Sequence, residues 1–378
     1  MDTCGQNGTA KQKIMLFSGF LGSGKTTTMV ETANYLKGKG MKVALITNDL
    51  GENLVDTNYA RLSGVPVREI QNGCLCHDVT HFLETVKELV QAEAPDIIFA
   101  EPVGSCVDLV RSVYQELDLN FADEYELLPL IGVTDPRRYE SIYLHPENNT
   151  FNDETTYMYK KQLEDADVIL LNKCDLISSE KKDELLCSLR TTFPHANVIP
   201  VITEWQENYE EWTQAFCNGQ TASLRKLDID WDYIWRGDEH MGWYNNTFNY
   251  YAKKAVNYTP VCEELLKRIQ DGFEKEHAEI AHLKVLCDIH LGYAKAAVTS
   301  TRQEIHFSRT LERKSNNGKM NINIRAIAPP EVIERIVNQS ILETAEANQL
   351  EICCAKYQVF DSFEQAEEPV SFGSCCCS

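Results

Sequence analysis

The sequence predicts an α/β protein: a P-loop NTPase parallel sheet with helices on both faces, followed by a smaller ferredoxin-like α+β domain. Three observations support this fold. Apolar runs alternate with helical patterns over roughly the first 200 residues, which is typical of a parallel sheet covered on both sides. A glycine-rich phosphate-binding pattern follows the first apolar run. Strand–helix–strand patterns then recur near the end of the chain.

The first part of the chain contains apolar, β-rich runs that we expect to be buried strands. These runs span residues 14–18, 43–47, 67–70, 97–100, 128–133, 168–171 and 198–202. Helical patterns lie between them at residues 26–38, 79–92, 107–117, 155–166 and 179–193. Because ligands of such sheets bind beyond the carboxyl ends of the strands, we expect the functional residues in the loops that follow the runs.

The second part predicts a strand at 248–256, an amphipathic helix at 260–276, and a hairpin of strands 283–289 and 293–301. Residues 320–328, 330–345 and 350–358 complete a second strand–helix–strand unit. The expected organisation is therefore a flexible N-terminus (1–12), a P-loop GTPase domain (13–203), a connecting segment (204–246), an α+β domain (247–360) and a disordered tail (361–378).

The composition of the chain limits the kinds of molecule that we expect it to bind. The chain has 378 residues, 36 of them basic and 57 acidic, for a net charge of −21. Such a surface repels nucleic acids and anionic membranes and suits cations, so we expect no nucleic-acid or membrane partner. Residues 1–13 are polar and do not form a secretory signal. We therefore expect a cytoplasmic protein whose 14 cysteines are mostly reduced.

Residues 19–26, G-F-L-G-S-G-K-T, match the phosphate-binding P-loop. Backbone N–H groups and the following helix N-terminus would hold phosphates, Lys25 would reach the β- and γ-phosphates, and Thr26 would bind Mg²⁺. A dinucleotide-binding loop is excluded because Thr27 stands where its third glycine is required. The predicted nucleotide-binding residues of this loop are Gly22, Ser23, Gly24, Lys25, Thr26 and Thr27.

Asn172-Lys173-Cys174-Asp175 follows a buried run and matches the guanine-binding pattern N-K-x-D. The Asp175 carboxylate can accept two hydrogen bonds from guanine that adenine cannot offer. We therefore expect Asn172, Lys173 and Asp175 to bind the base of GTP.

Acidic residues end two further strands. Glu101 begins the loop Glu-Pro-Val-Gly, in which the Gly104 amide is positioned to sense the γ-phosphate. Asp49 follows the run 43–47. We expect Glu101 and Asp49 to act on Mg²⁺ or the attacking water, with Lys25 stabilising charge as the third catalytic residue.

Gly73-Cys74-Leu75-Cys76-His77 offers three metal-ligating side chains within four residues. Cys74, Cys76 and His77 could supply three vertices of a tetrahedral Zn²⁺ site and leave one for a partner. The alternative is a pair of buried structural thiols in a helix-capping loop. His81 lies one turn further and is interpreted as a surface or packing residue.

Taken in order, the P-loop, the acidic loop after the second strand, G-C-x-C, E-x-x-G and N-K-x-D resemble the CobW-type metallochaperone GTPases, relatives of the hydrogenase- and urease-maturation GTPases. The resemblance covers residues 13–203 and implies GTP-dependent delivery of a metal or metal cofactor. It implies Zn²⁺, or Co²⁺ in a corrinoid system, bound by Cys74, Cys76 and His77, where His77 replaces the family's third cysteine. A client metalloprotein or corrinoid protein is the expected partner, and a homodimer is left open.

Two other functions remain open at this point. One is a regulatory GTP-binding scaffold that switches a client enzyme without transferring metal. The other is an ATP-using kinase or transferase on the same loop, which would prefer adenine. The tail Cys375–Cys377 could handle metal or consist of passive thiols, and Cys353-Cys354 fits core packing. The histidines of the second domain, His282, His290 and His306, are not expected to be ligands.

Overall fold

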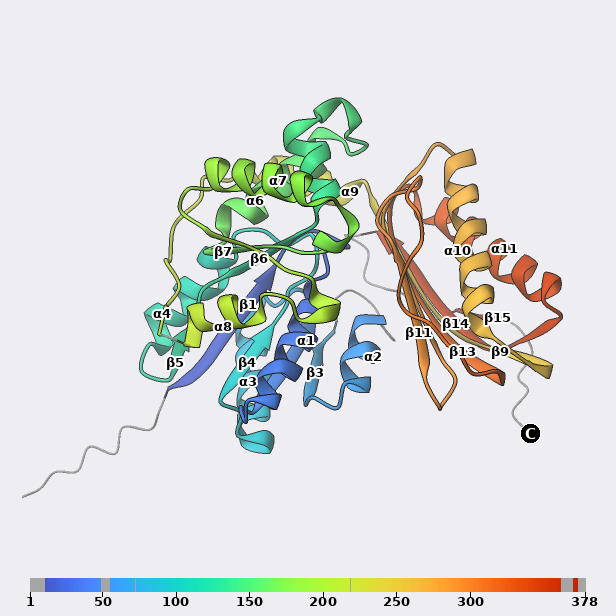
Figure 1. Cartoon of the computed structure of the whole chain (residues 1–378), viewed down its shortest axis with the longest axis horizontal. Coiled ribbons are helices and arrows are strands. Elements are labelled where there is room, and N and C mark those ends of the chain that lie inside the picture. Colours follow the sequence, from blue (N-terminus) through green and yellow to red (C-terminus); the bar gives the residue numbers. More distant parts are fainter. Residues whose placement is uncertain (1–10, 49–54, 72, 218, 362–369, 373–378) are drawn as a thin grey trace, which may run out of the picture.

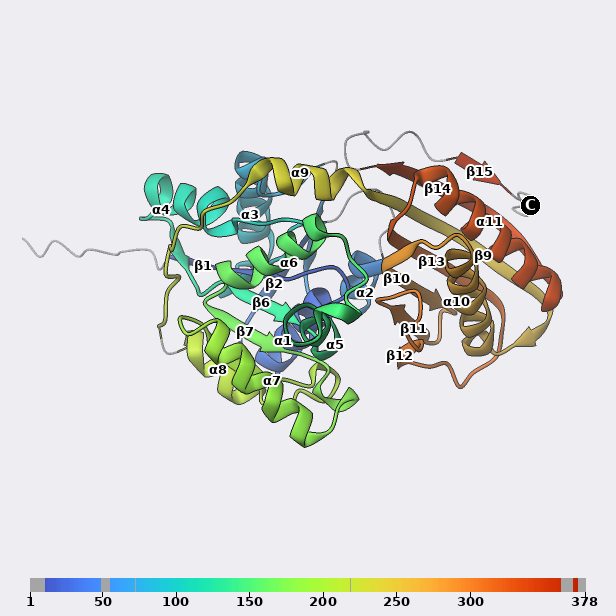
Figure 2. The same ribbon diagram turned by 90° about the horizontal axis from the view of Figure 1, so that it is seen from above.

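The computed structural model of the chain describes residues 11–48, 55–71, 73–217, 219–361 and 370–372. Two sheets lie side by side, one in each half of the chain (Figures 1 and 2). The N-terminal sheet is parallel, in the order β3-β2-β4-β1-β6-β7-β8, with β5 paired to β1. Its strands are β1 (Gln12–Ser18), β2 (Val43–Asn48), β3 (Val67–Ile70), β4 (Ile97–Ala100), β5 (Tyr125–Leu127), β6 (Ile131–Thr134), β7 (Val168–Leu171) and β8 (Asn197–Pro200).

Helices cover both faces of this sheet, as the sequence predicts. On β1, Ile14 and Leu16 pack with helices α3 and α4, whereas Met15 and Phe17 pack with α1, α2 and α8 on the other face. The helices are α1 (Lys25–Gly38), α2 (Val55–Leu62), α3 (Val79–Glu93), α4 (Gln115–Phe121), α5 (Pro136–Tyr139), α6 (Asp153–Asp165), α7 (Ser179–Thr192) and α8 (Tyr209–Cys217). A π-helical turn, Val110–Tyr114, leads into α4.

Two parts of this half differ from the sequence prediction. The strand expected at 128–133 begins only at Ile131, as β6, and a separate short strand, β5, precedes it at Tyr125–Leu127; Pro129, which has no N–H to give to a sheet, lies between the two. The segment 204–246, expected to be a connection, contains α8, α9 (Trp231–Glu239) and the start of the next strand. Helix α8 forms because Tyr209, Trp212 and Phe216 lie on one of its faces and are buried against the sheet.

The C-terminal half is a ferredoxin-like sandwich, as predicted. Its sheet is antiparallel in the order β12-β11-β10-β13-β9-β14-β15, in which the central four strands and two helices follow the ferredoxin-like arrangement. Helices α10 and α11 cover one face and enclose an apolar core. The elements are β9 (Met241–Val256), α10 (Tyr258–Lys275), β10 (Glu279–Asp288), β11 (Tyr293–Val298), β12 (His306–Arg309), β13 (Ser315–Ile327), α11 (Pro330–Ala347), β14 (Leu350–Asp361) and β15 (Val370–Phe372).

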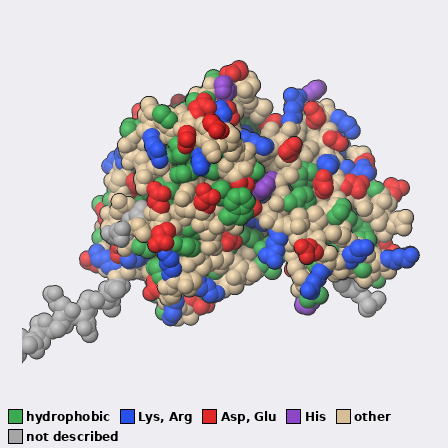
Figure 3. Space-filling view, viewed as in Figure 1, with side chains coloured by type: hydrophobic (Ala, Val, Ile, Leu, Met, Phe, Trp, Pro, Cys, Tyr) green, Lys and Arg blue, Asp and Glu red, His purple; other side chains and the backbone are tan. Residues whose placement is uncertain are grey.

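The contact between the two halves has an apolar side and a polar side. On the apolar side, Trp243 and Phe360 of the second sheet belong to the same buried cluster as Phe20 of the P-loop. On the polar side, the uncovered face of the second sheet meets the loops at the carboxyl ends of the first, through pairs such as Lys284 with Asp56. Figure 3 shows the two halves in contact, with acidic and basic side chains interspersed over the visible surface.

None of the helices in the described part of the chain combines the length and apolar character that a membrane crossing requires. Residues 1–10 of the predicted N-terminal segment and most of the predicted tail, including Cys375–Cys377, lie outside the described residues. Two described parts of these segments differ from the prediction, since Gln12 begins β1 and Val370–Phe372 of the tail forms β15, which pairs with β14.

Candidate functional site

The P-loop connects β1 to α1 and lies at the carboxyl edge of the parallel sheet. Helix α1 begins at Lys25, and its N-cap Gly24 has φ 101°, a left-handed conformation that suits glycine. No side chain caps this helix, so its first N–H groups are available to an anion. A Cβ on Gly24 would lie 2.4 Å from Asn172 Nδ2, which explains why a glycine is required where the two nucleotide motifs meet.

Lys25 and Thr26 have the positions that phosphate and magnesium binding require. The Lys25 ammonium donates to the carbonyl of Gly19 at 2.6 Å, inside the loop. Thr26 Oγ1 donates to both carboxylate oxygens of Glu101 at 2.8 Å. A hydroxyl and a buried carboxylate beside a phosphate loop are the donors expected for Mg²⁺, so these residues fit that ion.

Glu101 is 3% exposed at the end of β4. Burial, and secondarily the charge of Asp56, raise the pKa of its carboxyl to about 7, although Lys25 and the Thr26 hydroxyl oppose this shift. The other predicted acid, Asp49, lies outside the described residues.

The N-K-x-D residues surround the P-loop from the β7 side. Asn172 donates from Nδ2 to the Ser23 carbonyl at 3.2 Å and accepts from the Thr203 hydroxyl at 2.6 Å. Lys173 donates to the Gly22 carbonyl at 2.8 Å, and burial lowers the pKa of its ammonium. Asp175 lies at the rim of the cleft with an exposed side chain, where a base could reach it.

These residues line one cleft. Gly104 lies in its wall, packed so closely on Leu21 that a Cβ would be 2.2 Å from Leu21 Cδ2 and 3.4 Å from the Lys25 ammonium. Thr27 also lines the cleft, and its hydroxyl accepts from Lys295 of β11 at 2.9 Å. Of the predicted nucleotide-binding residues, Ser23 does not line the cleft, and its buried hydroxyl has no hydrogen-bond partner among the described residues.

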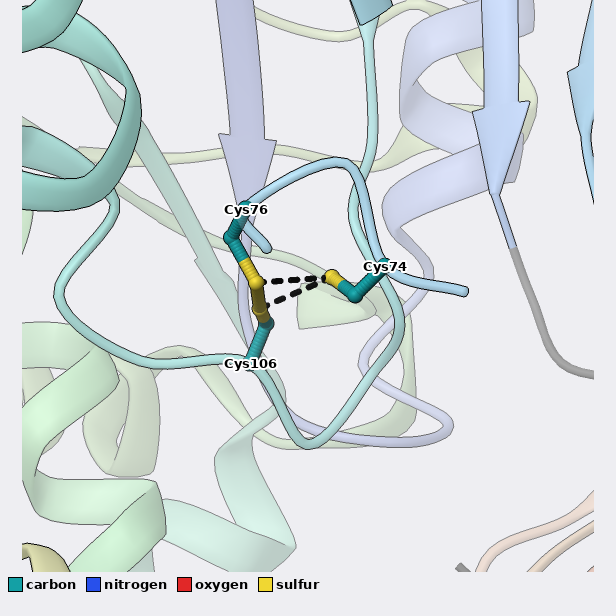
Figure 4. Close-up of side chains that lie close together, drawn as sticks. All are labelled: Cys74, Cys76 and Cys106. Atoms are coloured by element: carbon teal, nitrogen blue, oxygen red, sulfur yellow. Dashed lines mark hydrogen bonds between the residues drawn. A yellow bond between two sulfur atoms is a disulfide. The ribbon is translucent and has the colours of Figure 1, made fainter. Parts of the chain in front are cut away.

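A cluster of three cysteines lies beside the nucleotide cleft (Figure 4). Cys74 and Cys76 come from the predicted loop, and the third is Cys106, from the loop after β4. The Cys74 sulfur lies 2.8 Å from that of Cys76 and 3.0 Å from that of Cys106, and Cys76 and Cys106 are joined in a disulfide. All three sulfurs lie within 4.8 Å of one another, and in the reduced form they are a donor set suited to Zn²⁺.

His77, the predicted third ligand, is exposed and is not part of this cluster. The chain turns at Cys74, whose carbonyl accepts the N–H of His77, and α3 begins two residues after His77 with Asp78 as its N-cap. This turn brings both cysteines inward and directs the imidazole outward. The position that the family resemblance assigned to His77 is filled by a sulfur from a different loop.

Sequence reasoning also missed Asn48, the last residue of β2, which holds the cysteine loop. Its Nδ2 donates to the carbonyls of Ile70 and Gly73 at 3.1 and 2.7 Å, and its Oδ1 accepts the N–H of Leu75 at 2.9 Å. Because Asn48 also lines the nucleotide cleft, it touches both sites.

The loop 101–106 connects the two sites directly. Glu101 meets Thr26, Gly104 meets the P-loop, and Cys106 lies in the sulfur cluster. Gln162 of α6 holds this loop by donating to the carbonyls of Gly104 and Cys106 at 2.9 and 2.8 Å. The signal that could have revealed Cys106 is its spacing from the acid in E-P-V-G-S-C.

Comparisons with known proteins show which family this chain resembles. Residues 13–200 match the family model described as CobW/HypB/UreG, nucleotide-binding domain. The chain is 28% identical over 222 residues to zinc-regulated GTPase metalloprotein activator 1 of Dictyostelium discoideum, covering 51% of this chain and 46% of that protein. It is 31% identical over 175 residues to the zinc chaperone YeiR of Escherichia coli K12, covering 45% of this chain and 49% of that protein.

The chain thus spans about half the length of these curated relatives. Among solved structures, the hydrogenase maturation factor HypB from Archaeoglobus fulgidus is similar at 19% identity and a TM-score of 0.37, covering 55% of this chain and 89% of that one. Because that TM-score is low, the family of this chain is assigned from the sequence match over residues 13–200. Through this domain, the chain belongs to the CobW/HypB/UreG family of P-loop GTPases.

Proposed function

We propose that this protein binds and hydrolyses GTP and uses its nucleotide state to control a thiolate metal site, from which it delivers Zn²⁺ to a client metalloprotein. The single observation that supports this proposal is the loop 101–106, in which Glu101 accepts a hydrogen bond from Thr26, Gly104 packs on the P-loop and Cys106 lies in the sulfur cluster, all within six residues. A movement of this loop on GTP binding changes the sulfur cluster at the same time.

The residues in the cleft support the proposed binding and hydrolysis of GTP. The α1 N-terminus and Lys25 bind and neutralise the phosphates, and Asp175 selects guanine. Thr26 and Glu101 would hold Mg²⁺, which neutralises charge on the β- and γ-phosphates when bound. Glu101 and Asp49 are proposed to orient the attacking water, and Lys25 stabilises the charge that develops during transfer.

The three cysteine sulfurs support the proposed binding and delivery of Zn²⁺. Three thiolates suit Zn²⁺ and leave one coordination position for exchange with a client. Zinc is preferred as cargo because relatives are named zinc chaperones, and Co²⁺ or a corrinoid is the competing cargo. Since thiols must be reduced to bind metal, we propose a cytoplasmic site of action.

The test is a zinc titration against a chromophoric chelator in reducing buffer, with GDP or a non-hydrolysable GTP analogue present. We expect the zinc affinity to differ at least about fivefold between the two nucleotides. Cys106→Ser should weaken zinc binding strongly, whereas Cys187→Ser on the exposed face of α7 should leave it unchanged. Running the same titration with Co²⁺ compares the two cargoes.

Equal zinc affinity in both nucleotide states would contradict metal delivery. If GTP is nevertheless hydrolysed in that case, the protein is a regulatory GTPase switch without a metal cargo. A preference for ATP over GTP would contradict both GTP-dependent metal delivery and a regulatory GTPase switch.

A further inference from the structure

The C-terminal sheet presents a polar, cationic face to the nucleotide cleft. Along β10, the side chains of Leu283 and Val285 point into the apolar core, so His282 and Lys284 point the other way, toward the cleft. On the paired strand β11, Lys295 shares that face, because the register places Lys284 opposite Ala297.

This face touches the P-loop directly. Thr299, just after β11, packs on Gly22 so closely that a Cβ on that glycine would lie 2.3 Å from the Thr299 methyl group. Lys295 is 6% exposed, donates to the Thr27 hydroxyl at 2.9 Å and lies 3.4 Å from the centre of the Tyr59 ring. These contacts hold β11 and the residue after it against the P-loop, the first turn of α1 and helix α2.

Lys284 lines the cleft together with Asp56 and Glu101. Its ammonium pairs with Asp56 of α2, and the two side chains are 17% and 14% exposed. Its charge acts on Glu101, the proposed magnesium ligand, and lowers the pKa of that carboxyl against the larger effect of burial. Lys284 is therefore close to the groups that face the terminal phosphate, and its present counter-ion is a carboxylate.

His282 lies in the same wall of the cleft and indicates that a ligand contacts this wall. The side chain is 1% exposed and lines the cleft, and neither ring nitrogen has a hydrogen-bond partner among the described residues. Buried polar atoms of this kind are costly unless a ligand or water satisfies them. The unpartnered imidazole is thus an independent sign that an occupant of the cleft contacts the C-terminal sheet.

We propose that the C-terminal domain completes the nucleotide site in cis, and that Lys284 exchanges its pairing with Asp56 for the terminal phosphate of GTP. This inference rests on the proposed GTP binding. The ammonium of Lys25 serves the phosphates from the P-loop, and that of Lys284 serves them from the opposite wall. GDP lacks the terminal phosphate, so it leaves Lys284 with Asp56, and the contact between the two halves of the chain then differs between the two nucleotides.

The test compares GDP with a non-hydrolysable GTP analogue by calorimetric titration of the full chain in Mg²⁺. Lys284→Met keeps most of the aliphatic stem and removes the charge. It should weaken binding of the GTP analogue about 10- to 100-fold, the range expected for a lost charge-assisted hydrogen bond, and change GDP binding less than about twofold. Lys284→Arg should retain most of the discrimination, and Lys319→Met on the exposed part of β13 is the matched control.

A second measurement separates this role from a purely structural ion pair. Asp56→Asn frees the Lys284 ammonium and should strengthen binding of the GTP analogue, and this gain should fall sharply in the Lys284→Met background. Thermal unfolding of each variant checks that it folds, and Lys284→Gln, which also removes the charge, carries the comparison if Lys284→Met does not fold.

Equal weakening of GDP and GTP-analogue binding by Lys284→Met, or no weakening of either, would overturn the inference while the proposed function stands. Failure of the unaltered protein to bind guanine nucleotide at all would overturn the proposed function as well.

Discussion

At the scale of single residues, the buried carboxyl of Glu101 gives the clearest pH-dependent behaviour. Its pKa is raised to about 7, chiefly by burial, whereas the unfolded chain titrates near the ordinary value of 4.5. Between these two pH values the folded state holds a proton that the unfolded state releases, so this group lowers stability as pH rises through the window. Above pH 7 the whole cost is present.

Glu101→Gln is therefore expected to stabilise the nucleotide-free protein at pH 8 while it abolishes GTP hydrolysis. The gain is at most about 3 kcal/mol, and it should shrink toward zero as the pH falls to 5. Thermal unfolding in EDTA at both pH values measures it. A variant that is less stable than the unaltered protein at pH 8 would show that the carboxylate is better satisfied than its burial indicates.

Asp175, at the rim of the cleft, is the residue proposed to select guanine. Asp175→Asn replaces an acceptor of two guanine N–H groups by an amide, so GTP affinity should fall by about tenfold or more, while the weak binding of ATP changes little. Competition between GTP and ATP for a fluorescent guanine nucleotide measures both. Exposed Asp183 of α7 offers a matched control, since Asp183→Asn removes the same charge outside the cleft.

Residues whose role depends on the local chain were predictable, and those that depend on contacts between loops were not. Lys25, Thr26 and Glu101 were predicted because a motif and a strand end fix their positions. Cys106 and Asn48 lie 30 and 27 residues from the partners Cys76 and Leu75 that they meet. The spacing of Cys106 from Glu101 marks it only as a candidate, and its contact with Cys76 depends on how two separate loops pack. His77 was assigned by adjacency, whereas the turn at Cys74 directs it away.

At the scale of elements, two side chains connect the nucleotide cleft with the loops that carry the cysteines. Asn48 fixes the cysteine loop to the end of β2, and Gln162 fixes the loop 101–106 to α6. Both side chains are almost completely buried. Removing one should leave each binding site in place but loosen the mechanical link between them.

Gln162→Met keeps the side-chain volume and removes both hydrogen bonds to the loop 101–106. We expect the zinc affinities measured with GDP and with a GTP analogue to become equal within about twofold, whereas GTP binding itself changes little. Exposed Gln214 of α8 provides the control substitution Gln214→Met. Undiminished coupling in Gln162→Met would show that the signal travels through Asn48 instead.

The periodicity of the sequence predicted most elements, because buried parallel strands and amphipathic helices leave strong patterns. Strands β3, β4 and β7 begin and end at the predicted residues. The hydrophobic pattern was misleading where a single residue or a single helix face determines the secondary structure. Pro129 interrupts an otherwise continuous apolar run, and α8 is stabilised by three aromatic side chains in a segment that is otherwise rich in acidic residues.

At the scale of the whole molecule, the packing of Thr299 on Gly22 couples the position of the C-terminal domain to the P-loop. Gly22→Ala introduces a methyl group that this contact cannot accommodate, in a residue whose φ is +78°. We expect the halves to separate along their polar side and the radius of gyration from small-angle scattering to rise. Thr299→Ala in the same chain should reverse part of the change, and no reversal would assign the effect to backbone strain alone.

The sequence could not predict how the halves meet, since each has its own core and pattern. Their contact does, however, set the direction of any motion. On the apolar side of this contact, Trp243 and Phe360 lie in a buried cluster that both halves share. The polar side consists of ammonium, carboxylate and hydroxyl groups that water solvates readily. A rotation about the apolar side would expose only the polar side to water, so an opening of the two halves would leave no apolar surface exposed to other molecules.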